Sequence, residues 1–387
     1  LIPGSESMPD TAVPARRPAP TGAARRPRLT WAVALAAMMA AFGAHAQGTL
    51  LDHALAIEAD LQGYPARAES ELAALMPRAD AAPAAERRIV YALYGQAMAL
   101  TGKVAEAEDV AGRLDGATTR TRDPADRAAA LVVRAAIESS FGEASKSLAH
   151  AQLARDLVAG SGDPHLHYWA AMALGIAART RGRPEDAMAN LHDALSLAEA
   201  ADNPFRRSSA FYQLSVLQRE LRNAPEALAA SLAAYRFAEA AKCAYAMVNA
   251  RMAESAVMEL LDRPARELAA MQEALAIARS SRSTTAEAKA LINLADIRLR
   301  RKEFSEAVAL SRRASSLAQS LGDSGLAATS KANLGFALLG LGRAAEGKRY
   351  ADEAMAEYER TGAITEIAEL AGEYGRSLEQ HGDYRGA

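Results

Sequence analysis

The side chains in this chain that could do chemistry do not form a complete catalytic or metal site. His165 and His167 are two residues apart at a predicted helix start, so they point in different directions and cannot share a metal ion. The run 101–104 (Thr-Gly-Lys-Val) matches the end of a phosphate-binding loop in part. However, Ala97 stands where the first glycine is required, and Val104 replaces the hydroxyl that binds Mg²⁺. No two carboxylates stand out as general acid and base. We therefore expect no catalytic residue, no metal and no cofactor.

Cysteine usage and charge narrow the classes of function further. Cys243 is the only cysteine, which excludes an internal disulfide and a thiolate metal cluster. The formal net charge is −2, so no overall field attracts nucleic acid or an anionic membrane. The basic cluster of Arg298, Arg300, Arg301 and Lys302 is interpreted as the last turn of a helix, where the helix dipole favours cations, and contact with an acidic partner is the alternative. We expect no nucleic-acid partner, and we expect a membrane role only through a terminal signal, an anchor or a downstream segment.

Small residues recur at a step of forty residues. The repeat that they indicate must determine where the remaining side chains lie. One alanine position holds that step through Ala154, Ala194, Ala234, Ala274, Ala314 and Ala354. A second position, upstream of it, is small throughout: Gly95, Ala135, Gly175, Ser215, Ser255, Ala295, Gly335 and Gly375. A third, rich in glycine, falls between them: Gly102, Gly142, Gly182, Arg222, Asp262, Lys302, Gly342 and Gly382. A fixed period of this length is typical of a stacked repeat array.

Each repeat reads as a helical hairpin. In residues 283–322, Thr284 and Glu287 have the spacing of a capping box and predict a helix start. A polar stretch at 298–303 ends this helix, and a second apolar helical pattern runs from Phe304 to Leu317. We count one early repeat at 49–82, seven more to about residue 362 and a ninth from about residue 364 that is cut short at residue 387. The predicted fold is all-α, a right-handed α-solenoid of about eight and a half such repeats.

The first 48 residues read as a separate, secretory segment. Arginines precede an uncharged run from Leu29 to Phe42, and Ala44-His45-Ala46 supplies a small-x-small cleavage site. This pattern predicts a signal peptide cleaved after Ala46, and an uncleaved membrane anchor is the alternative. The domains are therefore 1–48, with upstream residues and signal, and 49–387, the repeat array. We expect a periplasmic or secreted protein.

The repeat resembles the tetratricopeptide family. The resemblance rests on Leu334-Gly335, on Gly342-Arg343, and on the alanine positions that include Ala307 and Ala314. It covers residues 49–387. The period is longer than the usual 34 residues. Three residues depart from the expected small or apolar type and put the register of two repeats in doubt: Arg134, Glu254 and Glu267.

The resemblance implies that the first helices of the repeats line a concave groove that binds a peptide or protein. Side chains there that are neither small nor part of the packing stripe are then binding candidates. The set is Trp169, Met172, Arg179, Tyr212, Gln213, Arg219, Asn249, Met252, Asn293, Asp296, Asn333 and Phe336.

Two pairs in this set share a position of the repeat. Asn293 and Asn333 could bond both the N–H and the C=O of an extended peptide. Arg179 and Arg219 could bind a carboxylate through two parallel hydrogen bonds. The alternative readings stay open: the methionines and Tyr212 can equally pack between hairpins, and the arginines can equally be solvated helix ends.

A narrower likeness concerns the stretch 333–343, Glu346-Gly347 and the run 382–385. With the signal peptide, these are similar to the periplasmic sensor half of tetratricopeptide-containing GGDEF diguanylate cyclases. The resemblance implies that a membrane helix and a catalytic domain follow Ala387. Our leading hypothesis is a non-catalytic periplasmic scaffold that acts as the sensory part of a larger signalling protein. The alternatives are a fragment of a diguanylate cyclase and a scaffold for envelope or secretion assembly.

Overall fold

The computed structural model describes residues 49–140, 143–361, 367–368, 370–372 and 375, and these residues form helices with no strand among them. The first helices of the hairpins are α2 (Leu50–Glu58), α4 (Ala84–Leu100), α6 (Pro124–Ser140), α8 (Pro164–Thr180), α10 (Pro204–Glu220), α12 (Ala244–Leu260), α14 (Thr284–Arg300) and α16 (Ser324–Gly340). The second helices are α3 (Pro65–Asp80), α5 (Val104–Thr121), α7 (Ala144–Val158), α9 (Pro184–Ala200), α11 (Ala224–Ala240), α13 (Pro264–Ser280), α15 (Phe304–Leu321) and α17 (Ala344–Thr361). The expected signal peptide and most of the expected ninth repeat lie outside the described residues.

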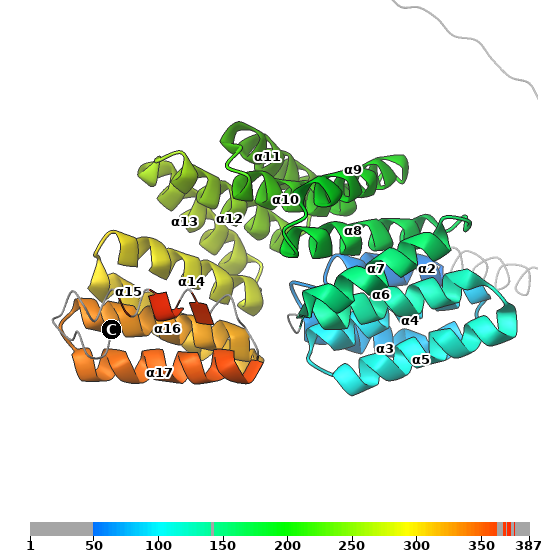
Figure 1. Ribbon diagram of the computed structural model, residues 1–387, viewed down its shortest axis with the longest axis horizontal. Helices are drawn as coiled ribbons and strands as arrows, with labels where there is room; N and C mark the ends of the chain where they lie inside the picture. Colours follow the sequence, from blue (N-terminus) through cyan, green and yellow to red (C-terminus); the bar gives the residue numbers. More distant parts are fainter. Residues whose placement is uncertain (1–48, 141–142, 362–366, 369, 373–374, 376–387) are drawn as a thin grey trace, which may run out of the picture. The chain divides into compact units, whose positions relative to one another are not determined.

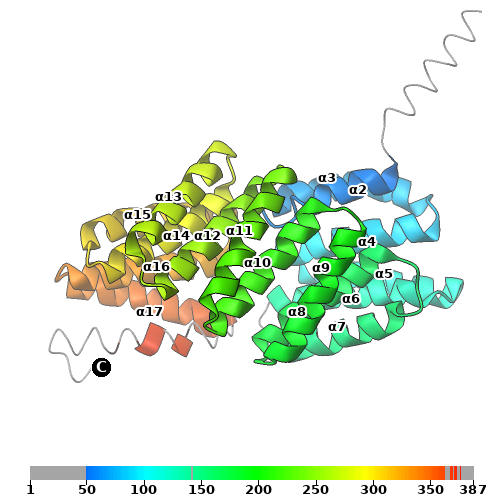
Figure 2. The same cartoon turned by 90° about the horizontal axis from the view of Figure 1, so that it is seen from above.

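The hairpins stack in chain order. Each first helix packs against the second helix that follows it, and each second helix packs against the next first helix (Figure 1; seen from above in Figure 2). The first helices from α4 to α16 also contact one another in succession, whereas the described second helices do not. The first helices therefore form the inner layer. This arrangement confirms the all-α, tetratricopeptide-like solenoid. In the described part of the chain, no helix has both the length and the apolar character needed to cross a bilayer.

The turn position of the repeat has a left-handed backbone, which explains its glycines. Gly102, Gly182 and Gly342 have φ values of 67–77°, and Arg222, Asp262 and Lys302 adopt φ values of 53–61° at the same step. Glycine enters this region without the steric cost that a Cβ imposes. The non-glycine turns keep the same conformation, so the step of forty residues is constant through them.

The small-residue position is a helix contact. A Cβ added at Gly95 would lie 2.7 Å from Val133, and one added at Gly175 would lie 2.8 Å from Leu191. Backbones approach this closely only where a side chain is absent or minimal. At Gly95 and Gly175, close helix packing therefore explains the small residue.

The three residues that depart from the pattern of the repeat form ion pairs, and the register is kept around them. Arg134 binds two carboxylates of α5, Glu254 binds Arg251, and Glu267 binds Arg300. The helices around them have the regular lengths of their neighbours. One detail of the expected hairpin at 283–322 is wrong. Helix α14 begins at Thr284, but its N-cap is Ser283, whose hydroxyl accepts the N–H of Ala286.

Candidate functional site

A short segment at the end of α2 crosses the N-terminal ends of α8, α10, α12 and α14. These helices are far from it in the sequence. We call residues Glu58–Tyr64, the end of α2 and the turn before α3, the latch segment. Its contacts reach α8, α10, α12 and α14, and they join residues between 111 and 220 positions apart. It therefore holds repeats together that do not follow one another in the chain.

Glu58 makes the most buried of these contacts. Its carboxylate accepts hydrogen bonds from Arg206 Nε and Nη2 at 3.0–3.2 Å and from the indole Nε1 of Trp169 at 2.6 Å. Glu58 is 5% exposed and Arg206 is 1% exposed. The Arg206 guanidinium also lies over the ring of Tyr168, 4.7 Å from its centroid. A buried bidentate pair of this kind is specific in geometry, and removing one partner leaves an uncompensated charge.

The rest of the latch segment is bound through its backbone and one phenol. Cys243 Sγ donates to the carbonyl of Ala59 at 3.5 Å, and Ser283 Oγ donates to the carbonyl of Gly63 at 3.1 Å. Tyr64 Oη donates to the carbonyl of Ser281 at 3.0 Å.

Gly63 is required at its place in the latch segment, because an added Cβ would lie only 2.7 Å from Tyr245 Cβ. At that distance one of the two groups must move.

His165 adjoins the same cluster. Burial lowers the pKa of its imidazole, and the positive charge of Arg206 lowers it further against the opposing charges of Asp163 and Glu58. Its ring lies 6.3 Å from that of Trp169. The neutral form of His165 is therefore favoured beside the latch segment.

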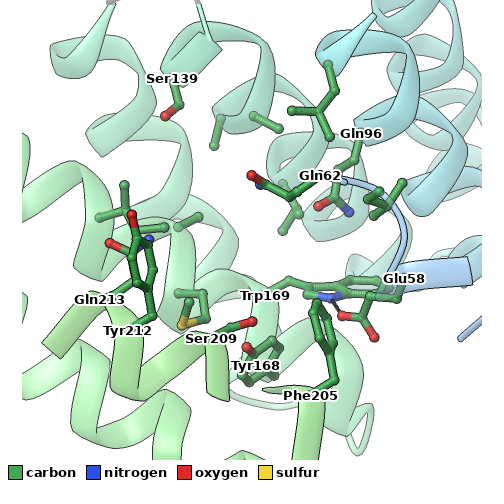
Figure 3. Close-up of a pocket in the computed structure, with 18 of the residues that line it drawn as sticks. Glu58, Gln62, Gln96, Ser139, Tyr168, Trp169, Phe205, Ser209, Tyr212 and Gln213 are labelled. Atoms are coloured by element: carbon green, nitrogen blue, oxygen red, sulfur yellow. Dashed lines mark hydrogen bonds between the residues drawn. The ribbon is translucent and has the colours of Figure 1, made fainter. Parts of the chain in front are cut away.

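The latch segment closes one side of a cavity on the inner layer, which we call the latched pocket. Its volume is about 340 Å³, and its walls come from the latch segment, α4, α6, α7, α8, α10 and α12. The aromatic wall residues are Tyr168, Trp169, Phe205, Tyr212 and Tyr245. Figure 3 shows Trp169, Glu58 and Phe205 gathered at one end, with Tyr212 and Gln213 at the other. Among the described residues of the wall, Glu58 alone is charged, and Arg206 neutralises it.

Four side-chain amides also line this pocket, namely Gln62, Gln96, Gln213 and Asn249. Gln96 bonds the carbonyl of Ala92 in its own helix. The amides of Gln62, Gln213 and Asn249 make no hydrogen bond with any other described residue. Each amide group can donate and accept, as a peptide bond does. The pocket thus combines an apolar aromatic surface with three unengaged amides.

A second cavity follows along the groove, and we call it the charged pocket. It has a volume of about 200 Å³ and shares Tyr212 with the latched pocket. Arg300 lies in its wall and binds three carboxylates there: Glu259 at 3.1 Å, Glu267 at 2.6 Å and Asp296 at 3.0 Å. Among these four side chains, negative charge is in excess.

The two pockets contain nine of the twelve binding candidates from the sequence. The latched pocket is lined by Trp169, Met172, Tyr212, Gln213 and Asn249. The charged pocket is lined by Tyr212, Arg219, Met252, Asn293 and Asp296. Met172 and Met252 also pack against core clusters, so both readings of these side chains hold in part. Ligand binding by the set stays a prediction.

Three candidates lie outside both pocket walls. Arg179 forms an ion pair with Glu220 at 2.5 Å, and the amide of Asn333 donates to the carbonyl of Ile292 at 3.1 Å. Phe336 packs against an apolar cluster further along the array. The expected pairing of Arg179 with Arg219 is therefore altered, because Glu220 already neutralises one of the two arginines.

Two groups among the wall residues that the sequence did not indicate differ in how far they could have been predicted. Phe205 and Tyr245 share one position of the forty-residue step, at the starts of α10 and α12, and that shared aromatic character was a usable signal. Glu58, Leu61 and Gln62 come from the latch segment. Nothing local in the sequence indicates that these three residues meet α8 and α10. Within the described ranges, no group of three His, Cys, Asp or Glu side chains is placed to hold a metal ion.

No protein-family model and no curated protein matches this sequence. Solved structures match its fold. A Rap protein in complex with Competence and Sporulation Factor has a TM-score of 0.64 at 12% identity, covering 88% of this chain and 95% of that chain. The Cut9–Hcn1 hetero-tetramer of the APC/C matches with a TM-score of 0.57 at 11% identity, over 81% and 54% of the two chains. NprR in complex with its cognate peptide NprX matches with a TM-score of 0.52 at 12% identity, over 73% and 82%. At these identities the likeness establishes the helical-repeat fold and nothing finer.

Proposed function

We propose that this chain is a non-catalytic binding scaffold whose groove holds a peptide, with an apolar or aromatic side chain of that peptide in the latched pocket. One observation carries the proposal. The three unengaged amides of Gln62, Gln213 and Asn249 line a cavity with aromatic walls. Aromatic surface recognises an apolar anchor, and free amides supply the donors and acceptors that a peptide backbone needs.

The absence of an unpaired charge among the described wall residues of the latched pocket favours an uncharged ligand side chain there. The carboxylate of Glu58 is already bound by Arg206 and Trp169, so the latched pocket offers no free charge to a ligand. Burying a charged side chain there would leave that charge unpaired, which is strongly unfavourable.

Two of the structures with the same fold are complexes by their own descriptions. NprR holds its cognate peptide, and the Rap protein holds Competence and Sporulation Factor. The NprR complex supports a peptide as the class of ligand.

The test is affinity selection of acetylated hexapeptide mixtures on the full chain, read by mass spectrometry. Ala173→Leu adds volume in the wall of the latched pocket, whereas Ala189→Leu makes the same change on an exposed position of α9. We expect the Ala173 variant to lose the retained peptides and the Ala189 variant to keep them. Equal retention by both variants would place binding elsewhere, and retention of no peptide by the unaltered chain would contradict the proposal.

On the sequence pattern alone, we further propose a periplasmic location and a role as the sensory part of a larger signalling protein. The support is the signal-peptide pattern of residues 1–48 and the resemblance described above. Cell fractionation with N-terminal sequencing tests the location, with Gln47 expected as the first residue. Reading the coding sequence past residue 387 tests the signalling role. A membrane span and a GGDEF motif there would support it, and an immediate stop codon would contradict it.

A further inference from the structure

Lys289 contacts a residue of the latched pocket and has no carboxylate partner among the described residues. It lies on α14 at the repeat position that Trp169, Ser209 and Asn249 hold on earlier first helices, and those three line the latched pocket. Its Nζ donates to Tyr245 Oη at 2.7 Å and lies 5.3 Å from the centroid of that ring. Tyr245 itself lines the pocket. Lys289 thus holds, one repeat further along, the same position as three residues that line the pocket.

The ammonium of Lys289 has two unused donors. Of its three N–H bonds, the phenol of Tyr245 takes one, and no carboxylate of a described residue lies within ion-pair distance. Burial lowers the pKa of Lys289, but Tyr245, Tyr212 and the more distant Asp323 together raise it above the ordinary value. The side chain is therefore cationic at neutral pH. Partly buried charges in proteins are normally paired with an opposite charge. Lys289 has no such carboxylate partner among the described residues.

Arg219 is a second cation without a carboxylate partner among the described residues, and its charge acts on Tyr212. Burial raises the pKa of Tyr212, while Lys289, Arg179 and Arg219 oppose that rise. Arg179 is bound to Glu220, but the guanidinium of Arg219 makes no ion pair or hydrogen bond with a described residue. Positive charge from Lys289 and Arg219 therefore acts on Tyr212, at the boundary of the two pockets.

The charged pocket limits where an anion could sit. Beyond this boundary, Glu259, Glu267 and Asp296 crowd around Arg300. Their negative charge disfavours an anion in the charged pocket beyond Tyr212. Favourable potential for an anion is therefore confined to the surroundings of Tyr212 and Tyr245.

We propose that Lys289, with Arg219, forms an anion subsite that binds a carboxylate of the ligand next to the latched pocket. The inference rests on the proposed function and deepens it. The ligand is a peptide that places an uncharged side chain among the aromatic residues and a carboxylate against the ammonium of Lys289. Ammonium–carboxylate hydrogen bonds are charge-assisted and stronger than neutral ones.

Three acetylated hexapeptide mixtures, applied to the full chain, test the subsite. The first is randomised over uncharged residues and ends in a free carboxylate, and the second is the same mixture ending in an amide. The third is amidated and carries one aspartate at a fixed inner position. We expect the first or third mixture to be retained about tenfold better than the second. The better of the two identifies a terminal or a side-chain carboxylate as the source.

Substitutions test whether Lys289 causes the preference for carboxylate-bearing peptides over amidated ones. Lys289→Met removes the charge at similar length and should abolish the preference while leaving the retention of amides unchanged. Lys289→Arg should keep the preference, and Lys242→Met, at an exposed turn residue, should not affect it. Equal retention of acid and amide mixtures by the unaltered chain would overturn the subsite and leave peptide binding intact. Retention of none of the three would overturn both.

Discussion

The latched pocket and the charged pocket lie on consecutive first helices of one repeat array, yet different parts of the chain determine their character. The charged pocket is formed by residues of α10, α12, α13 and α14, which follow one another in the stack. The latched pocket also needs Glu58, Leu61 and Gln62 from a hairpin four repeats earlier than α10. The first is therefore a local product of neighbouring repeats, and the second depends on a long-range contact.

The two central arginines express the same difference. The side chain of Arg206 is 1% exposed and has a single carboxylate partner, supplied by the latch segment. The side chain of Arg300 is 39% exposed and has three carboxylates, one from its own helix and two from α12 and α13. A charge with one buried partner depends wholly on that partner. The comparison teaches that a regular repeat fixes where side chains stand, whereas contacts outside the repeat decide which of them are closed off from water.

The largest expected effect comes from Arg206→Met. Glu58 would stay buried without its cation, so the free energy of unfolding should fall by about 3–5 kcal/mol. Urea denaturation followed by circular dichroism measures it. Arg207→Met is the matched control, because Arg207 pairs with Asp202, whose side chain is 94% exposed, and such pairs contribute at most about 1 kcal/mol. Equal losses for the two variants would show that the latch segment is not a special feature.

Gly63→Ala should have the next largest effect. Its Cβ would clash with Tyr245, so the latch segment must move away from α12 at a cost of about 1–3 kcal/mol. Cys243, which is buried and binds the carbonyl of Ala59, should then react faster with a thiol reagent. Gly116→Ala on α5 is the control, since a Cβ there meets only the end of the Arg120 side chain, at 3.9 Å. That variant should keep the slow labelling rate and gain slightly in stability.

A smaller loss is expected from Lys289→Met. The contacts that raise the pKa of Lys289 outweigh its burial, so the fold favours the ammonium over its solvated form. Removing it, with its hydrogen bond to Tyr245, should lower the stability of the free protein by at most about 1 kcal/mol. Thermal unfolding of the unliganded chain measures the change in Tm. A loss as large as that of Arg206→Met would show that the Lys289–Tyr245 contact is structural, and it would weaken the case for an anion subsite.

The sequence predicted the parts of this molecule that repeat. The spacing of Gly95 and Gly175, and of the turn residues, follows from helix contacts and left-handed turns that recur in every hairpin. The inner positions also followed from the repeat, so nine of the twelve candidate residues line a cavity. Such contacts are local, and a periodic pattern records them.

The latch segment could not be predicted in this way. Glu58 and Arg206 are 148 positions apart, and neither occupies a position that the repeat marks as unusual. Their meeting depends on how the stacked hairpins turn through space, which small rotations at each interface determine together. The same limit explains Arg179. Its position on the helix was predicted, but its partner Glu220 is a helix-terminal residue of the next repeat.

Acidic pH should weaken the contacts of the latch segment through His165. This is the smallest of the four expected effects. Burial and Arg206 hold the pKa of His165 below its ordinary value of about 6.5, so the folded chain binds its proton less readily than the unfolded chain. Its contribution to stability is therefore complete above about pH 6.5 and is lost as the pH falls through the lowered folded pKa. The labelling rate of Cys243 and the Tm, measured between pH 7.5 and 5, report this loss. His165→Gln should remove that part of the pH dependence, and His192→Gln, at an exposed position of α9, should retain it. If the His165 variant kept the full pH dependence, other groups would control the latch segment, and the neutral imidazole beside Arg206 would have no part in closing the pocket.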